Sequence, residues 1–269
     1  MAETPETPGT PESAQPEAAK PTKLEKLDAL RKSEPKRRIP RFIVVTMIGG
    51  AVCGTLMGIA TAVVFKAYKM PAGSMWPTVV ARETVLANRY AKPDRAAIVV
   101  FRYPEQRTQL FAKRIVGLPG DRISVHKDGE LSINGWRVPR CNVGRAWFRS
   151  DDPSDTEKHQ GMLAVEFLGT ATYLVFEDEI VPGTIGEGME WKVPAGEYFV
   201  LGDNRNNSHD SRAWFGGKGG GVPTSDVVGS VYGRTEVRLP KGEGTDGLAP
   251  GLATCLSQRP AQTEPPRPQ

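Results

Sequence analysis

One serine in the sequence stands in a setting that suits a nucleophile. Ser74 follows a long apolar segment and lies between Pro71 and Pro77 in the stretch "KMPAGSMWPT", and proline restricts the backbone on both sides. A serine hydroxyl becomes a nucleophile when a neighbouring base takes its proton. Ser74 is therefore either part of an ordinary turn after the apolar segment or a reactive residue whose base lies elsewhere in the chain.

A lysine among apolar neighbours is the best candidate for that base. In "FAKRIVGLPGD" the alternation of a β-strand places Lys113 on the same face as Phe111 and Ile115, with Arg114 on the opposite face. Burial disfavours the ammonium form and lowers a lysine pKa by about 3–5 units. A neutral Lys113 would accept the proton of Ser74 and return it to a leaving amine, as in Ser-Lys enzymes. The alternative is a lysine whose ammonium group reaches water along its aliphatic stem.

The other polar motifs do not meet the requirements of the chemistry they suggest. Ser, His and Asp are adjacent at residues 208–210, but neighbours on an extended chain point to opposite faces, which argues against a triad. The stretch that begins at Asp203 has Ser208 and Trp214 where a calcium loop needs its glycine and its glutamate. The glycine-rich residues 216–221 lack the hydroxyl residue of a phosphate loop. We expect no metal site and no cofactor.

Cysteine content and net charge exclude further classes of protein. Three cysteines are too few for a disulfide scaffold and have the wrong spacing for zinc. Cys53 lies in the apolar segment, and we expect Cys141 and Cys255 not to pair, because Cys255 falls in a stretch poor in core residues. The net charge of +4 is modest, and the basic residues gather near the apolar segment. This argues against a nucleic-acid partner, which would need a basic face on the folded domain.

The apolar segment has the length of a membrane anchor. Residues 42–65 contain no charged side chain, and at about 1.5 Å per residue their helix would span a hydrocarbon core of about 30 Å. A cleaved targeting peptide has a short charged region before a shorter apolar core, whereas here residues 1–41 precede the segment. We expect one transmembrane helix.

The flanks of this helix predict its orientation. Lys36, Arg37, Arg38 and Arg41 stand before it, so the positive-inside rule places the amino terminus in the cytoplasm and the rest of the chain on the exported face. Gly50, Gly54 and Gly58 follow one another at intervals of four residues. Small residues at this spacing would let another helix approach closely, although glycine is also simply common in membrane helices.

The rest of the chain is expected to be mainly β, with antiparallel sheets in a compact exported domain at residues 66–238. Short runs of Val, Ile, Phe and Tyr alternate there with turn residues, and a hairpin is expected at Asp128-Gly129. Residues 141–190 are more polar and irregular, and they predict either a more irregular insertion or a second sub-layer. Residues 1–41, apart from a short charged helix, and residues 239–269 are predicted to be disordered tails.

Five stretches together resemble one enzyme family. "MPAGSMWPTVV", "VVFRYPEQ", "KRIVGLPGDRISV", "INGWRVP" and "VPAGEYFVLGDNRNNSHDSRAW" occur in the order and spacing of bacterial type I signal peptidases. The resemblance implies a membrane-anchored serine endopeptidase of the bacterial cytoplasmic (inner) membrane. Its amino terminus would be cytoplasmic and its catalytic domain periplasmic. It would cleave N-terminal signal peptides from exported preproteins, with those signal peptides and the lipid bilayer as its partners.

The resemblance also implies roles for single residues. Ser74 matches the nucleophile, Lys113 the general base, and Ser208 the serine that orients the lysine. Met75 and Ala72 flank the nucleophile and are expected to contact substrate. The remaining matched residues are expected to support the site: Asp203, Arg205, Asp210 and Arg212.

Two positions depart from the family pattern and keep other functions open. Ala72 stands where the family more often has a serine that serves as the second oxyanion donor, and Asn206 replaces a common aspartate near Arg205. One alternative is a specialised maturation peptidase of the same family. Another, which Ala72 favours, is a catalytically weak membrane-tethered β domain that binds exported chains. Self-cleaving Ser-Lys repressors do not fit, because the chain has no place for their DNA-binding helix pair.

Overall fold

The computed structural model describes residues 22–33, 40–149, 156–179, 184–234, 237–241 and 243–268. The chain divides into two units, Met1–Thr55 and Leu56–Gln269. The described helices are α1 (Lys23–Ser33), α2 (Arg41–Val64), α3 (Trp214–Gly217) and α4 (Ala249–Ser257), and the short 3-10 turns are Gly73–Met75, Thr224–Asp226 and Glu243–Thr245.

Helix α2 corresponds to the predicted anchor. It starts one residue before the predicted range and ends at Val64, where the chain continues into a strand. None of its residues is buried, and its length and composition suffice to cross a membrane. The predicted disorder of residues 1–41 lies mostly outside the described residues, and the described part contains α1, the short charged helix.

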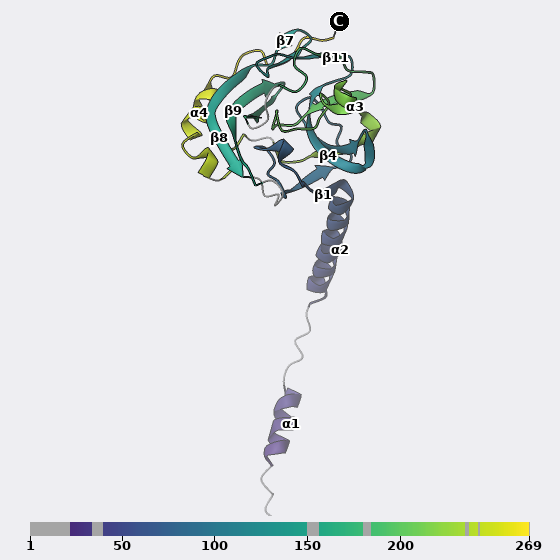
Figure 1. Cartoon of the computed structure of the whole chain (residues 1–269). Coiled ribbons are helices and arrows are strands. Elements are labelled where there is room, and N and C mark those ends of the chain that lie inside the picture. The colour runs from purple at the N-terminus through teal and green to yellow at the C-terminus, as the bar shows by residue number, and fades with distance from the viewer. Residues whose placement is uncertain are drawn as a thin grey trace, which may run out of the picture. The chain divides into compact units, whose positions relative to one another are not determined.

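The described residues of the second unit form three antiparallel sheets (Figure 1), which confirms the predicted fold class. The largest has the order β1 (Phe65–Lys69), β2 (Thr84–Asn88), β14 (Val227–Val231), β3 (Ile98–Tyr103), β4 (Gln106–Gly117), β12 (Glu197–Leu201) and β13 (Val222–Pro223). The second has the order β10 (Ala171–Asp178), β9 (Lys158–Leu168) and β8 (Arg140–Arg149). The third has the order β11 (Glu190–Lys192), β5 (Arg122–Val125), β6 (Leu131–Ile133) and β7 (Trp136–Arg137).

The predicted hairpin is the pair β5 and β6. Ile123 lies opposite Ile133 and Val125 opposite Leu131, and all four side chains are buried. The loop closes through the N–H of His126, which donates to the carbonyl of Glu130, and Gly129 adopts a φ of 76°. Glycine suits this turn because its positive φ strains other residues. The loop is longer than the expected two-residue turn.

One apolar core joins the three sheets. Ile123 and Ile133 from the third sheet pack with Leu168 and Val175 from the second and with Phe199 from the first. Burying each of these large side chains stabilises the fold by about 1.5–3 kcal/mol. The sheets are therefore held as one body around the strands that carry the site.

The described part of residues 141–190 contains a second, three-stranded sheet, which agrees with the predicted second sub-layer and not with an irregular excursion. β8, β9 and β10 are long paired strands, and Cys141 lies opposite Val165, with one register shift in the β8–β9 ladder between Asn142 and Gly144. The exposed face of β8 carries polar residues between buried ones such as Val143 and Ala146. The buried residues of β8 do not follow a strict period of two, and the ladder shifts register near Asn142, so the polar residues concealed this strand in the sequence.

The prediction of a disordered tail at residues 239–269 is also wrong for the described residues. Helix α4 lies against β8 and β9 (Figure 1), and it buries Leu252 and Cys255 with Val143 and Leu163. Beyond α4, the N–H of Gly169 donates to the carbonyl of Thr263 at 2.8 Å. Few apolar residues hold this segment, so its composition alone resembles that of a tail.

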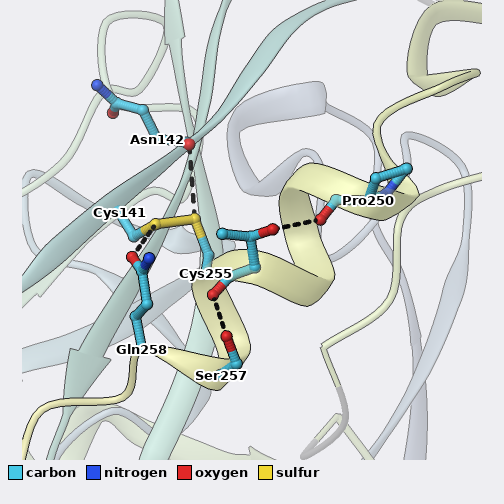
Figure 2. Close-up of a disulfide and its surroundings, with 7 residues drawn as sticks. Cys141, Asn142, Pro250, Cys255, Ser257 and Gln258 are labelled. Carbon is cyan, nitrogen blue, oxygen red and sulfur yellow. Dashed lines mark hydrogen bonds between the residues drawn. A yellow bond between two sulfur atoms is a disulfide. The ribbon is translucent and has the colours of Figure 1, made fainter.

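The expected absence of a Cys141–Cys255 bond is corrected as well, because the two residues form a disulfide (Figure 2). The bond ties α4 to β8 across a sequence separation of 114 residues. Within α4, the Thr254 hydroxyl donates to the carbonyl of Pro250 at 3.0 Å and that of Ser257 to the carbonyl of Thr254 at 2.8 Å. A covalent link thus replaces much of the apolar contact that a longer helix would supply.

Candidate active site

The segment that carries Ser74 is a single 3-10 turn, Gly73–Met75, held by its neighbours. Met75 is 2% exposed and packs with Val79 and Val85. Trp76 stacks on Phe148 with ring centroids 4.4 Å apart. Met75 and Trp76 directly follow Ser74 and are buried in two different apolar clusters, so they hold the serine turn in a defined position.

Lys113 lies on β4 beside this turn. Its side chain is 3% exposed, and its Nζ lies 2.5 Å from the Oγ of Ser74. The ammonium position is 5.5 Å from the ring centroid of Phe111, which shares its face of the strand. The structure therefore brings together the two residues that the sequence selected for a nucleophile and a base.

Burial decides the protonation of this lysine. Desolvation lowers the pKa of Lys113 to about 8, although the carboxylates of Asp210 and Asp203 act in the opposite direction. An exposed lysine titrates near pH 10.4 and is almost entirely charged at about pH 7. A pKa of about 8 leaves a useful fraction of neutral amine close to neutral pH, as a general base requires.

Residues 202–212 form the floor under the serine turn. The N–H of Asn204 donates to the carbonyl of Ser74 at 3.1 Å, and its side-chain Nδ2 lies 3.5 Å from the carbonyl of Gly73. Asn204 is fully buried, and the sequence analysis missed it because its bonds join residues far apart in the chain. It positions the turn and does not itself take part in proton transfer.

Gly202 allows this close approach. A Cβ on this residue would lie 2.5 Å from the carbonyl oxygen of Ser74 and 2.2 Å from the Oγ of Ser208. Both distances are well inside contact range, and the first involves backbone that cannot rotate away. The glycine is therefore required by space rather than by backbone conformation.

This contact gives a testable prediction. Gly202→Ala should lower kcat about 100-fold with a smaller change in KM, because a shift of about 1 Å in the nucleophile costs that much. Steady-state kinetics on a peptide substrate would measure the effect. Gly49→Ala is the matched control, since its added Cβ would meet no atom within 4 Å. Unchanged kcat in Gly202→Ala would contradict the proposed packing.

Three buried ion pairs surround the floor. Asp203 accepts bonds of 2.8 and 2.7 Å from Arg114, and Asp210 accepts bonds of 2.9 and 2.7 Å from Arg212. Arg205 donates to Glu166 at 2.7 and 2.5 Å. Removing one partner of such a pair costs about 3–5 kcal/mol. These contacts support the view that the matched charged residues stabilise the site rather than react.

The Arg205 partner differs from what the sequence suggested. Asn206 does not leave Arg205 without a nearby charge, because Glu166 on β9 supplies one. Asn206 instead donates to the carbonyl of Asp178 at 3.2 Å. Sequence reasoning missed Glu166, and the available signal was a single carboxylate inside the apolar run "LAVEFL".

Ser208 is buried, but it does not make the hydrogen bond to Lys113 that the resemblance implies. Among the described residues its Oγ has no partner of good geometry. It lies close enough to Asp210 to act on that carboxyl: burial would raise the pKa of Asp210, but Arg212, the N–H of Gly202 and Ser208 together hold it below its usual range. The orienting role of Ser208 stays a prediction.

A groove of about 330 Å³ opens onto the pair. Ala72 and Met75 belong to one wall, Leu110 and Phe111 to the other, and Asn207 lies in its lining. Ala72 contributes only a methyl group, so it offers no side-chain donor to the site. The groove is mostly apolar and suits small side chains of an extended peptide.

A family model described as signal peptidase, peptidase S26, matches residues 41–235. The chain belongs to this family. The signal peptidase I of Pseudomonas aeruginosa is 33% identical over 186 residues, which cover 61% of this chain and 62% of that protein. The signal peptidase I of Pseudomonas fluorescens is 32% identical with the same coverage. This chain thus spans less than two thirds of the length of these relatives.

A solved signal peptidase I from Enterococcus faecalis V583 is also similar. It is 29% identical, and the alignment covers 52% of this chain and 97% of that one with a TM-score of 0.30. The family match runs from the first residue of α2 to just beyond β14. The apolar helix, the 3-10 turn that carries Ser74 and the strand that carries Lys113 therefore all lie inside it.

Proposed function

We propose that this chain is a membrane-anchored serine endopeptidase, a signal peptidase I, that removes N-terminal signal peptides from exported preproteins. The observation that carries the proposal is the 2.5 Å approach of Lys113 Nζ to Ser74 Oγ at a buried position. Family membership supports the same activity. Ser74 is the nucleophile and Lys113 the general base.

The reaction follows from this geometry. Neutral Lys113 takes the proton from Ser74 as its Oγ attacks the scissile carbonyl, and the resulting ammonium then protonates the leaving amine. The acyl group remains on Ser74 until Lys113 activates a water that releases it. The N–H of Ser74 would stabilise the oxyanion. Since Ala72 offers no hydroxyl, loss of a second donor of this kind would cost about 10²–10³ in rate unless another group replaces it.

The sheet supplies a place for the substrate. β12 pairs with β4 only at Arg114, Ile115 and Gly117, so within the described residues the earlier part of β4 has one edge without a partner strand. An extended signal peptide would add to this edge through main-chain hydrogen bonds. Small side chains one and three residues before the cut would enter the apolar groove at Ala72 and Met75.

The proposed membrane anchor, its orientation and a helix–helix contact all concern α2. The anchor is assigned to residues 42–65, with the amino terminus cytoplasmic, the peptidase domain at residues 66–238 on the periplasmic face, and the bilayer as a partner. Cations before the helix support this orientation. The open space around Gly50, Gly54 and Gly58, where an added Cβ would meet no atom within 4 Å, would admit a second helix.

One assay tests the function. The full chain in phospholipid vesicles is incubated with a preprotein that has alanine one and three residues before the expected cut, and the product is sequenced from its amino terminus. A matched preprotein with tryptophan directly before the cut should resist cleavage. Binding of the preprotein without turnover would instead support the weak binding domain that Ala72 keeps open, and cleavage of one substrate class alone would support a specialised maturation peptidase.

The pKa of Lys113 predicts the pH profile. The active form is the neutral amine, which is lost as pH falls below the pKa, so kcat/KM should rise with pH through a midpoint of about 8 and then level off. Well below this pH the rate should fall about tenfold per pH unit. Stopped assays from pH 6 to 10, with unfolding checked at each pH, would measure it. A flat profile from pH 6 to 9 would argue against a lysine base.

A further inference from the structure

A second cleft lies outside the catalytic groove. It has a volume of about 300 Å³, and its walls include Lys66 and Tyr68 of β1, Arg89 and Tyr90 just after β2, and Arg102 of β3. No residue of this cleft lines the groove around Ser74. The peptidase mechanism assigns it no role.

The charge of this cleft is all of one sign. Its lining contains three cations and no acidic residue. The three cations are exposed and form no ion pair with the described residues, and Lys66 Nζ lies 5.3 Å from the ring centroid of Tyr68. Cations gathered in a concave site without a counter-charge attract anions. Two of them are arginines, whose planar guanidinium groups match the oxygens of a phosphate.

The cleft is also close to the end of α2. Lys66 is two residues beyond Val64, and the N–H of Arg89 donates to the carbonyl of Val64 at 2.9 Å. The end of a transmembrane helix lies at the level of the lipid headgroups. Tyr90 is 69% exposed and Tyr232 67% exposed, and tyrosine is enriched at this level of membrane proteins.

We propose that Lys66, Arg89 and Arg102 form a binding site for the phosphate of an anionic phospholipid. The ligand is a phosphodiester headgroup such as that of phosphatidylglycerol, held by the three cations while its acyl chains remain in the bilayer. The site needs α2 to span the membrane, but it does not depend on peptidase activity.

Photo-crosslinking tests the site directly. The full chain is reconstituted in phosphatidylcholine vesicles that contain a phosphatidylglycerol with a photoreactive group near its phosphate, and labelled residues are mapped by mass spectrometry. Wild-type chain should be labelled within residues 65–69 and 86–103. Combined Lys66→Gln, Arg89→Gln and Arg102→Gln should reduce that labelling at least fivefold, since one cation near an anionic surface contributes about a fivefold preference.

Two controls separate this site from general charge. A control variant combines Arg122→Gln, Lys127→Gln and Arg137→Gln. It also removes three positive charges, but from exposed positions in the third sheet and its hairpin loop, and it should leave labelling unchanged. Labelling near the cations at residues 36–41 serves as an internal reference. Arg102→Gln alone should give a partial loss, and it keeps the test valid if the triple variant unfolds.

Three results would overturn the proposal. They are equal labelling of wild type and triple variant, equal labelling by a photoreactive phosphatidylcholine, and displacement of the lipid by millimolar glycerol phosphate. The last result would assign the cleft to a free phosphate ester. Competition by unlabelled phosphatidylglycerol, without competition by glycerol phosphate, is the expected outcome.

Discussion

Lys113→Met is expected to reduce kcat/KM for a preprotein by about 10⁴-fold or more while leaving the protein folded. Methionine has nearly the shape of the lysine stem but no amine, so the base that lies 2.5 Å from Ser74 Oγ disappears. Removing a member of a catalytic pair has effects of this size in other serine hydrolases. Ser74→Ala should give a similar loss, and the double variant should be no worse than either single one.

Stability distinguishes this loss from unfolding. Burial lowers the pKa of Lys113, which means that the site disfavours its charged form, so an apolar side chain of equal volume should leave the free energy of unfolding unchanged or higher. Lys192→Met, on the exposed edge strand β11, is the matched control and should retain activity. Lys113→Arg keeps a charge but cannot act as a base, so it should also be inactive. Substantial cleavage by any Lys113 variant would refute the dyad.

Loss of the Cys141–Cys255 bond is expected to lower the free energy of unfolding by about 2–5 kcal/mol. The bond closes a long loop, with a sequence separation of 114 between its cysteines, and long loops lose the most conformational freedom in the unfolded chain. In a domain of this size the melting temperature should fall by about 10 °C. The double variant Cys141→Ala and Cys255→Ala, compared with wild type by thermal unfolding, measures the effect.

Reduction provides an independent check on that prediction. A thiol reductant should lower the melting temperature of wild type towards that of the double variant and should not change the variant itself. Cys53→Ala is the control, because Cys53 is a free cysteine in α2 and its loss should preserve the effect of the reductant. If reductant left wild type unaffected, the disulfide would contribute nothing to stability.

The sequence was sufficient for features that depend on local pattern. Strand alternation placed Lys113 on a face with Phe111, and a charge-free run predicted α2 to within one residue. The runs of β-branched and aromatic residues predicted the mainly β fold. Each of these follows from side chains a few residues apart, whose relative positions are fixed by the geometry of a strand or helix.

Features that join distant residues could not be predicted in the same way. Arg205 pairs with Glu166 at a sequence separation of 39, and α4 is held to β8 by a disulfide together with a small apolar cluster. Asn204 serves the site through backbone bonds to the serine turn, which depend on position more than on residue type. Local composition carries no information about such pairings, and here it made an ordered segment look like a tail.

The link between α4 and β8 also sets an order of events during synthesis. The contacts of α4 with the cluster that contains Val143 cannot be complete until residue 255 has been made and, with the proposed topology, has crossed the bilayer. By then Ser74 and Lys113 have long been translated. The last part of the domain to form is therefore remote in sequence from Ser74 and Lys113, and its disulfide would form in an oxidising compartment, as the proposed topology provides. In cells unable to oxidise exported thiols, proteases should degrade the newly made protein faster than in cells that form the disulfide.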